Sequence, residues 1–209
     1  MKKLESSLMN MVLVLTGVAV IMGAVLAFVN DMTSGPINAQ KEKALADGIK
    51  TVMACDGVTV AHTDTVRQND AKGKELTYII YQTKDDQGKD LGAAVESTTG
   101  GFGGDLKVLV GFNPDGQILG YALLEHAETP GLGAKADKWF QKGEKGDIIG
   151  KDPKEPLTVS KDGGQVDAIT ASTITSRAFL LAVNNAYNAY KATPIDGETG
   201  ATKQEKKGE

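Results

Sequence analysis

Cysteine and histidine are scarce in this chain of 209 residues, which contains one cysteine and two histidines. The single cysteine, Cys55, cannot form a disulfide or a cysteine-based metal site within the chain, and we expect it to be a small buried apolar side chain. His62 and His126 lie far apart in the sequence and match no metal-ligand spacing. The sequence therefore predicts no metal site.

A strong charge of either sign is also missing. The formal net charge of −4 is small for a chain of this length and argues against nucleic acid as a partner. The chain has no G-x-S-x-G nucleophile elbow, no Walker loop and no Ser/His/Asp set in a plausible order. By these motifs no ordinary hydrolytic site is visible in the sequence.

A long uncharged run is present near the N-terminus. No charged residue occurs between Ser6 and Asn30, and residues 8–29 as a helix at roughly 1.5 Å per residue can cross a bilayer core of about 30 Å. A cleaved signal peptide is the alternative, but its apolar region should be shorter and should end in an A-x-A-like site. Because Lys2 and Lys3 precede the run, we expect residues 1–7 to be cytoplasmic and the rest to lie outside.

The chain after the span divides by pattern. Thr33-Ser34-Gly35-Pro36 predicts a short break, after which Ile37–Met53 has the apolar spacing of a helix, so residues 30–54 are expected to form a membrane-proximal helix. Residues 55–192 form the predicted folded domain. Residues 193–209 contain little apolar content and are expected to be disordered.

The domain is predicted to be α+β, with a mainly antiparallel sheet flanked by helices. Residues 56–74 are poorly patterned, with a short strand expected at Val58–Val60. Further strands are expected at 76–82, 91–96, 106–112 and 118–124, and the turn Asn113-Pro114-Asp115-Gly116 joins the last two as a hairpin. A short helix at 134–142 and a final amphipathic helix at 177–191 complete the pattern.

Two glycine-containing loops stand at strand ends, where ligand contacts often gather. Gly100–Gly104 places four glycines around Phe102, which suits a backbone that lies against a flat ligand or, alternatively, a flexible loop. In Glu125–Gly133, Pro130 and Gly131 suit the two central positions of a type II turn. Trp139 and Phe140 follow and are interpreted as core side chains.

A hydroxyl-rich stretch, Asp167-Ala168-Ile169-Thr170-Ala171-Ser172-Thr173-Ile174-Thr175-Ser176, precedes the final helix. Its hydroxyls have two interpretations. They can cap the first N–H groups of the helix, or those N–H groups and the helix dipole can attract a phosphate. Local chemistry alone favours the cap.

The same stretch resembles the motif D-x-x-[ST]-G-A-T-x-[ST] of domains that carry covalent FMN on threonine, with Ala171-Ser172 in place of Gly-Ala. Glu128–Gly133 resembles the second motif of these domains, and Gly100–Gly104 with the strand after it is similar to their glycine-rich strand entry. With one N-terminal span, the chain resembles the G subunit of Rnf-type ion-translocating electron transport complexes over nearly all of residues 1–192.

The resemblance implies a set of FMN-binding residues. Thr173 matches the threonine that is esterified to the flavin phosphate, and the motif residues around it are expected to support that link. Arg177, four residues on, is expected to approach the phosphate or a nearby carboxylate. The remaining residues expected at the cofactor are Thr170, Ala171, Ser172, Ile174, Thr175, Glu128, Thr129, Gly131, Leu132 and Gly133.

The resemblance also implies partners and a place in the cell. It implies an inner-membrane, single-pass electron-transfer subunit whose FMN domain lies on the extracytoplasmic side, among the membrane and soluble subunits of its complex and the membrane lipid. A separate flavin transferase would attach the FMN. The complex would couple electron transfer between ferredoxin and NAD to Na⁺ or H⁺ translocation.

Two alternatives stay open on the sequence. One is the C subunit of a Na⁺-translocating NADH:quinone reductase, which uses the same flavin motifs. The other is a membrane-tethered scaffold or binding domain that carries no flavin.

Overall fold

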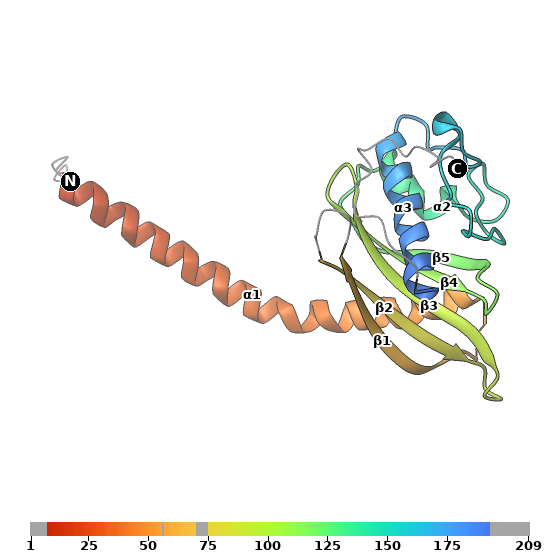
Figure 1. Ribbon diagram of the computed structural model, residues 1–209. Helices are drawn as coiled ribbons and strands as arrows, with labels where there is room; N and C mark the ends of the chain where they lie inside the picture. Colours follow the sequence, from red (N-terminus) through yellow and green to blue (C-terminus); the bar gives the residue numbers. More distant parts are fainter. Residues whose placement is uncertain (1–7, 56, 70–74, 193–209) are drawn as a thin grey trace. The chain divides into compact units, whose positions relative to one another are not determined.

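The structure is a computed structural model that describes residues 8–55, 57–69 and 75–192. The predicted cytoplasmic N-terminus, residues 1–7, and the predicted disordered tail, residues 193–209, lie outside the described residues. The chain divides into two units, Met1–Ala44 and Leu45–Glu209. In chain order the elements are α1, β1 to β5, the short helices η1 (Gly133–Lys135), α2 (Ala136–Trp139) and η2 (Ser160–Asp162), and α3 (Figure 1).

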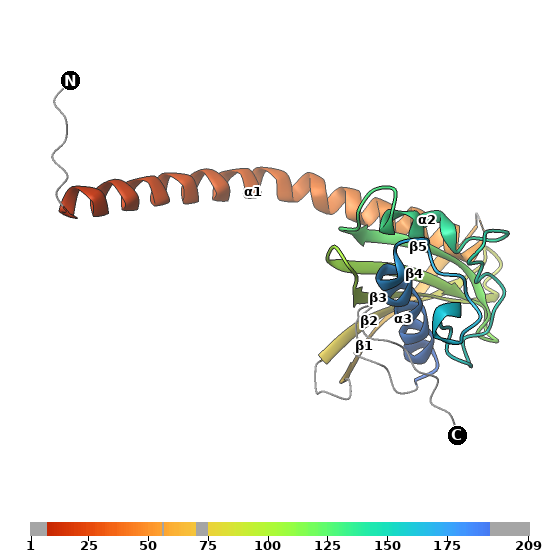
Figure 2. The same cartoon turned by 90° about the horizontal axis from the view of Figure 1, so that it is seen from above.

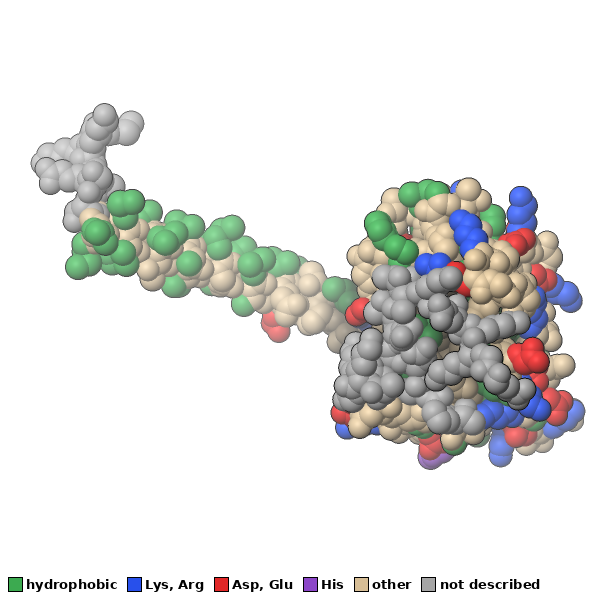
Figure 3. Space-filling view, turned by 45° about the horizontal axis from the view of Figure 1, so that its top comes forward, with side chains coloured by type: hydrophobic (Ala, Val, Ile, Leu, Met, Phe, Trp, Pro, Cys, Tyr) green, Lys and Arg blue, Asp and Glu red, His purple; other side chains and the backbone are tan. Residues whose placement is uncertain are grey.

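The first unit consists of helix α1, Leu8–Met53, which extends into the second unit. Among the described residues α1 is the one helix long and apolar enough to cross a membrane. Figure 3 shows its N-terminal stretch covered by hydrophobic side chains, as expected for a surface that meets lipid rather than water. Cys55, just after the helix, is a free thiol that is only partly buried, so its expected burial is incomplete.

The predicted break at residues 33–36 is wrong, because α1 continues through Pro36. The side-chain hydroxyls in this segment form hydrogen bonds with backbone carbonyls of the helix itself. Thr33 Oγ1 donates to the Val29 carbonyl at 2.8 Å, and Ser34 Oγ donates to the Asp31 carbonyl at 3.0 Å. Such bonds to the preceding turn are compatible with helix, so these residues do not need a loop.

The second unit is built on one five-stranded antiparallel sheet in the order β1-β2-β3-β4-β5, each strand pairing with the next (Figures 1 and 2). The strands are Thr59–Asn69, Glu75–Lys84, Asp90–Gly100, Asp105–Phe112 and Ile118–His126. The predicted hairpin between β4 and β5 is confirmed, and Asn113 Oδ1 accepts hydrogen bonds from the N–H groups of Gly116 and Gln117. The predicted α+β class is therefore correct.

The first strand is longer than the sequence predicts. The sequence indicates extended structure only at Val58–Val60, whereas β1 pairs with β2 from Thr59 to Asn69. This strand lies at the sheet edge and most of its side chains are exposed. An exposed edge strand needs no alternation of apolar residues, which removes the pattern that predicts a strand.

The two faces of the sheet bury two separate clusters. Alternating residues such as Ala93 and Val95 face helix α3, Thr173–Tyr190, together with Val108 and Val110. Phe179 of α3 stacks on Phe140 with ring centroids 4.2 Å apart, which confirms Phe140 as a core side chain. The opposite face buries the end of α1, where Ile49, Val52 and Met53 pack with residues of β2, β3 and β4.

Helix α1 approaches the sheet where the strands carry glycine. A Cβ atom built on Gly111 or on Gly120 would overlap the backbone of Val52. The helix backbone therefore rests on the strand backbone, with no side chain between them. A position of this kind tolerates only glycine unless the elements move apart.

We predict that Gly111→Ala destabilises the domain by about 1–3 kcal/mol, because the added methyl group must push Val52 away from β4. Chemical denaturation of the full-length protein in detergent measures the change. Gly88→Ala is the comparison. A Cβ at Gly88 meets nothing within 4 Å, so the left-handed φ of 80° is the only source of strain for alanine at that position. A larger loss for Gly88→Ala than for Gly111→Ala would contradict this account of the contact.

Candidate functional site

The candidate site begins at a buried carboxylate, Glu128, which is 6% exposed and joins three segments. Its Oε1 accepts hydrogen bonds from the N–H groups of Phe102 and Gly103, at 2.7 and 3.2 Å. Its Oε2 accepts from the Thr175 hydroxyl at 2.7 Å. The Glu128 side chain thus connects the loop after β5 to the glycine-rich hairpin, which is the β3–β4 turn at Gly100–Gly104, and to the first turn of α3.

Two glycines, Gly101 and Gly133, leave room for the Glu128 carboxylate. A Cβ on Gly101 would overlap Oε1, and a Cβ on Gly133 would overlap Oε2 and crowd Thr175 Oγ1. The Gly100–Gly104 segment is a tight turn between β3 and β4, in which Gly101 N–H donates to the Gly104 carbonyl at 2.8 Å. In the structure this segment is a hydrogen-bonded turn, and its glycines allow close packing around a carboxylate.

The predicted turn at Pro130-Gly131 is confirmed. Leu132 N–H donates to the Thr129 carbonyl at 3.1 Å, and Gly131 has the positive φ of 78° that the second central position of a type II turn requires. Thr129, Gly131 and Leu132 are exposed, whereas Gly133 is buried against Glu128. This loop therefore has a buried end at the carboxylate and an exposed tip.

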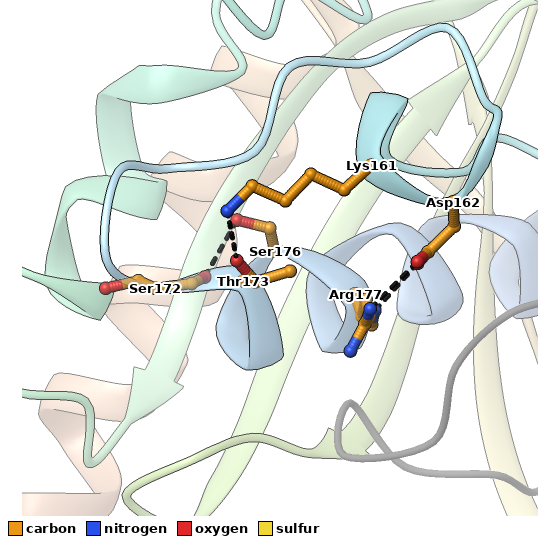
Figure 4. A network of polar contacts seen from close by, with 6 residues as sticks. All are labelled: Lys161, Asp162, Ser172, Thr173, Ser176 and Arg177. Carbon is orange, nitrogen blue, oxygen red and sulfur yellow. Dashed lines mark hydrogen bonds and ion pairs between the residues drawn. The ribbon is translucent and has the colours of Figure 1, made fainter.

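Thr173 is the first residue of α3, four residues earlier than the predicted helix start, and its side chain is half-buried. The Lys161 ammonium donates to Thr173 Oγ1 at 3.2 Å (Figure 4). Ser172 occupies the N-cap position but forms no side-chain capping bond. Capping by Ser172, which local chemistry favours, is therefore not what the structure shows.

The other hydroxyls of the stretch have different tasks. Ser176 Oγ donates to the Ser172 carbonyl at 2.9 Å and accepts from Ile169 N–H at 2.9 Å, so it ties the helix start to the chain before it. Thr175 is bound to Glu128. Thr170 is exposed and Ile174 is half-buried. Thr173 is thus the hydroxyl of the first turn that combines partial exposure with a cationic neighbour.

Arg177 approaches a carboxylate, which is one of its two predicted roles. Its Nε donates to Asp162 Oδ2 at 2.7 Å and its Nη2 to Asp162 Oδ1 at 2.8 Å, as a two-bond pair (Figure 4). The Asp162 side chain is 1% exposed. The hydrogen bond to Asp162 raises the pKa of Arg177, so this guanidinium stays charged and paired.

Sequence reasoning missed Lys161 and Asp162. Both belong to η2, Ser160–Asp162, a single turn that lies beside the start of α3. They precede Thr173 and Arg177 by 12 and 15 positions, and only the tertiary fold brings the pairs together. A charged residue in a polar loop gives no local pattern that would identify it.

A shallow open cleft of about 380 Å³ lies beside this polar cluster. Its lining includes Pro130 and Gly131 from the loop after β5, with Trp139, the last residue of α2, Ala136–Trp139. Trp139, expected in the core, is only partly buried at its edge, and its indole N–H donates to the Asp167 carbonyl at 2.9 Å. This bond ties the cleft to the hydroxyl-rich stretch. Trp139 is the aromatic side chain of the lining, which also includes the charged residues Lys135, Asp137, Lys138 and Glu144.

Ala171 occupies the motif position where glycine is usual, and its φ is 62°, in the left-handed region. An L-residue with a Cβ is strained there by roughly 1–2 kcal/mol, whereas glycine is not. The departure from the motif therefore places strain at the residue two positions before Thr173.

We predict that Ala171→Gly stabilises the domain by about 0.5–1 kcal/mol, because relief of the left-handed strain exceeds the entropy that glycine loses on folding. Ala168→Gly, at a position without positive φ, should instead destabilise it by a similar amount. Thermal unfolding of both variants measures the two signs. A lower midpoint for Ala171→Gly would disprove the strain.

We predict that Glu128→Ala destabilises the domain by about 2–4 kcal/mol, since it leaves two N–H groups and the Thr175 hydroxyl without their acceptor. Glu128→Gln should lose only about 1 kcal/mol, because one amide oxygen still accepts from the hairpin and its NH₂ group can donate to Thr175. Equal losses in the two variants, measured by urea denaturation, would show that charge rather than geometry matters.

Similarity to known proteins covers the same residues. A family model described as FMN-binding domain matches residues 101–188, which contain the glycine hairpin, Glu128, Lys161 and Thr173. The chain is 38% identical over 131 residues to the G subunit of the ion-translocating oxidoreductase complex of Aliivibrio fischeri (strain MJ11), an alignment covering 60% of this chain and 61% of that protein.

Two further relatives extend the comparison. The solved structure of Shewanella oneidensis NqrC is 24% identical, covers 63% of this chain and 70% of its own, and has a TM-score of 0.41. The G subunit of the same kind of complex from Vibrio cholerae (serotype O1, strain M66-2) is 33% identical over 181 residues, which cover 83% of this chain and 86% of that protein. By this extended similarity, the chain belongs to the family of G subunits of ion-translocating oxidoreductase complexes and contains its FMN-binding domain.

Proposed function

We propose that this chain is a membrane-anchored electron-carrier subunit whose FMN is attached by a phosphoester bond to Thr173. The observation that carries the proposal is the setting of one hydroxyl. Thr173 lies within the matched FMN-binding region, is partly exposed at the start of α3, and has the Lys161 ammonium 3.2 Å from its oxygen. A hydroxyl with a cation beside it suits a phosphate group.

The residues present fit both ends of an FMN molecule. At the phosphate end, Thr173 is partly exposed and the residues before it, Ala171 and Ser172, are small. At the ring end, the cleft lined by Pro130, Gly131 and Trp139 is bound to the motif through Asp167. We infer that Thr170, Ile174 and Thr175 shape the phosphate end and that Thr129, Leu132 and Gly133 present the loop to the ring.

Attachment would require a separate flavin transferase with an activated flavin phosphate, a phosphoanhydride. The Thr173 oxygen would bond to the flavin phosphorus, the phosphoanhydride bond would break, the leaving phosphate would depart with its electron pair, and the hydroxyl proton would be lost. Bound FMN would supply electron-transfer chemistry. The protein would then hold the flavin in place, and Glu128 would fix the loop, the hairpin and the helix around it.

The setting in the complex is also proposed. Residues 8–29 of α1 would cross the inner membrane once, with residues 1–7 in the cytoplasm and the FMN domain, residues 55–192, on the extracytoplasmic side. The chain would work among the membrane and soluble subunits of an Rnf-type complex that couples electron transfer between ferredoxin and NAD to Na⁺ or H⁺ translocation. The relatives named as G subunits of ion-translocating oxidoreductase complexes favour this setting over an NADH:quinone reductase.

We predict that Thr173→Val abolishes covalent flavin, because valine keeps the shape of threonine and removes the oxygen that bonds to phosphorus. Flavin fluorescence on a denaturing gel, with mass spectrometry of the peptide that contains residue 173, measures the outcome in protein made together with the flavin transferase. Thr173→Ser keeps an oxygen and should still be labelled.

Fluorescence that persists in Thr173→Val would move the attachment to another residue. An unmodified peptide from the natively assembled wild-type complex would leave a membrane-tethered domain without covalent flavin.

A further inference from the structure

Two cationic side chains lie at the first turns of α3, and they have different hydrogen-bond partners. Arg177 is fully paired with Asp162 through two short hydrogen bonds. Lys161 donates to the neutral hydroxyl of Thr173, and it forms no ion pair within 4 Å among the carboxylates of the described residues. Within the part of the chain that the structure describes, the positive charge at Thr173 therefore has no paired carboxylate.

The lysine is also held in place by its neighbours on both sides. Before it, Ser160 Oγ donates to Asp167 Oδ1 at 3.1 Å, and Ser160 N–H donates to the Val166 carbonyl at 2.7 Å. After it, the buried Asp162 carboxylate is bound by Arg177. Both ends of this three-residue turn are bound to the start of α3 or to the chain just before it, so the fold sets the backbone position from which the Lys161 side chain reaches Thr173.

We propose that Lys161 is the counter-ion of the flavin phosphoester at Thr173, and that the Arg177–Asp162 pair is the brace that positions it. The inference deepens the proposed function and rests on it. A phosphodiester carries one negative charge, and one unpaired ammonium beside the esterified oxygen balances it. Arg177 already donates two hydrogen bonds to the buried Asp162 carboxylate and would have to give them up to bind the phosphate.

The charge has a consequence for attachment. An anionic flavin phosphate donor approaches Thr173 more readily when Lys161 attracts it, and this attraction weakens as salt screens exposed charges. Because Lys161 is exposed, its loss should not disturb folding. The lysine therefore acts on the phosphate without being part of the core.

The experiment uses the full-length chain with its flavin transferase and measures the initial rate of flavin attachment at several salt concentrations. We expect Lys161→Gln to slow attachment about tenfold, which corresponds to ~1.4 kcal/mol, and to remove most of the salt dependence. Lys161→Arg, which keeps the charge, should restore most of the rate. Lys154→Gln, an exposed lysine two residues after Asp152, which lies near Tyr187 toward the other end of α3, is the matched control.

A second measurement does not depend on the rate. The ³¹P resonance of the attached phosphodiester should shift in Lys161→Gln and should stay at the wild-type position in Lys154→Gln. If flavin were attached to Lys161→Gln at the wild-type rate at every salt concentration, with an unshifted ³¹P resonance, the assignment of Lys161 as the counter-ion would be overturned.

An equal loss of rate in Lys161→Gln and Lys161→Arg would overturn it as well, because shape and not charge would then decide. A wild-type peptide that carries no flavin at residue 173 would refute the proposed function instead.

Discussion

The site depends on one buried carboxylate that three segments share. The Glu128 oxygens accept from two backbone N–H groups of the β3–β4 turn and from Thr175 in the first turn of α3. A carboxylate removed from water needs such donors, and each donor in turn needs an acceptor. The requirement is mutual, so the turn, the loop after β5 and the helix start are fixed as a group. The glycines at 101 and 133 follow from it, since any side chain there would displace the oxygens.

The pairing of charges also determines how the residues around Thr173 are arranged. Asp162 is buried and must be paired, and Arg177 pairs with it through both carboxylate oxygens. That pair holds the η2 turn against α3. Lys161, the residue before Asp162, donates to the threonine oxygen and forms no ion pair with a carboxylate of the described residues. The division separates a structural ion pair from a charge that can meet a ligand, within one turn of chain.

Much of the fold could be predicted because burial imposes a period on the sequence. Strands β2 to β5 and helix α3 each bury one face or both, and their apolar residues repeat accordingly. Most of strand β1 escaped prediction because it buries little, and α1 was divided in two because Thr33–Pro36 has the composition of a break. At the site, Thr173, Glu128 and the glycines have recognisable local patterns. Lys161 and Asp162 do not, since their partners are 12 and 15 residues away and are set only by packing.

The end of α1 and helix α3 pack on opposite faces of the sheet. On one face the end of α1 lies directly on the backbone at Gly111 and Gly120, so no flexible side chain separates the helix from the strands. On the other face α3 packs along β3 and β4, and its N-terminal residue is Thr173. The helix that would hold the chain in the membrane and the helix that would hold the flavin thus share the same strands while occupying opposite sides. The close backbone contact therefore lies on the α1 side, and the hydrogen bonds of Thr173 and Thr175 lie at the start of the helix on the other side.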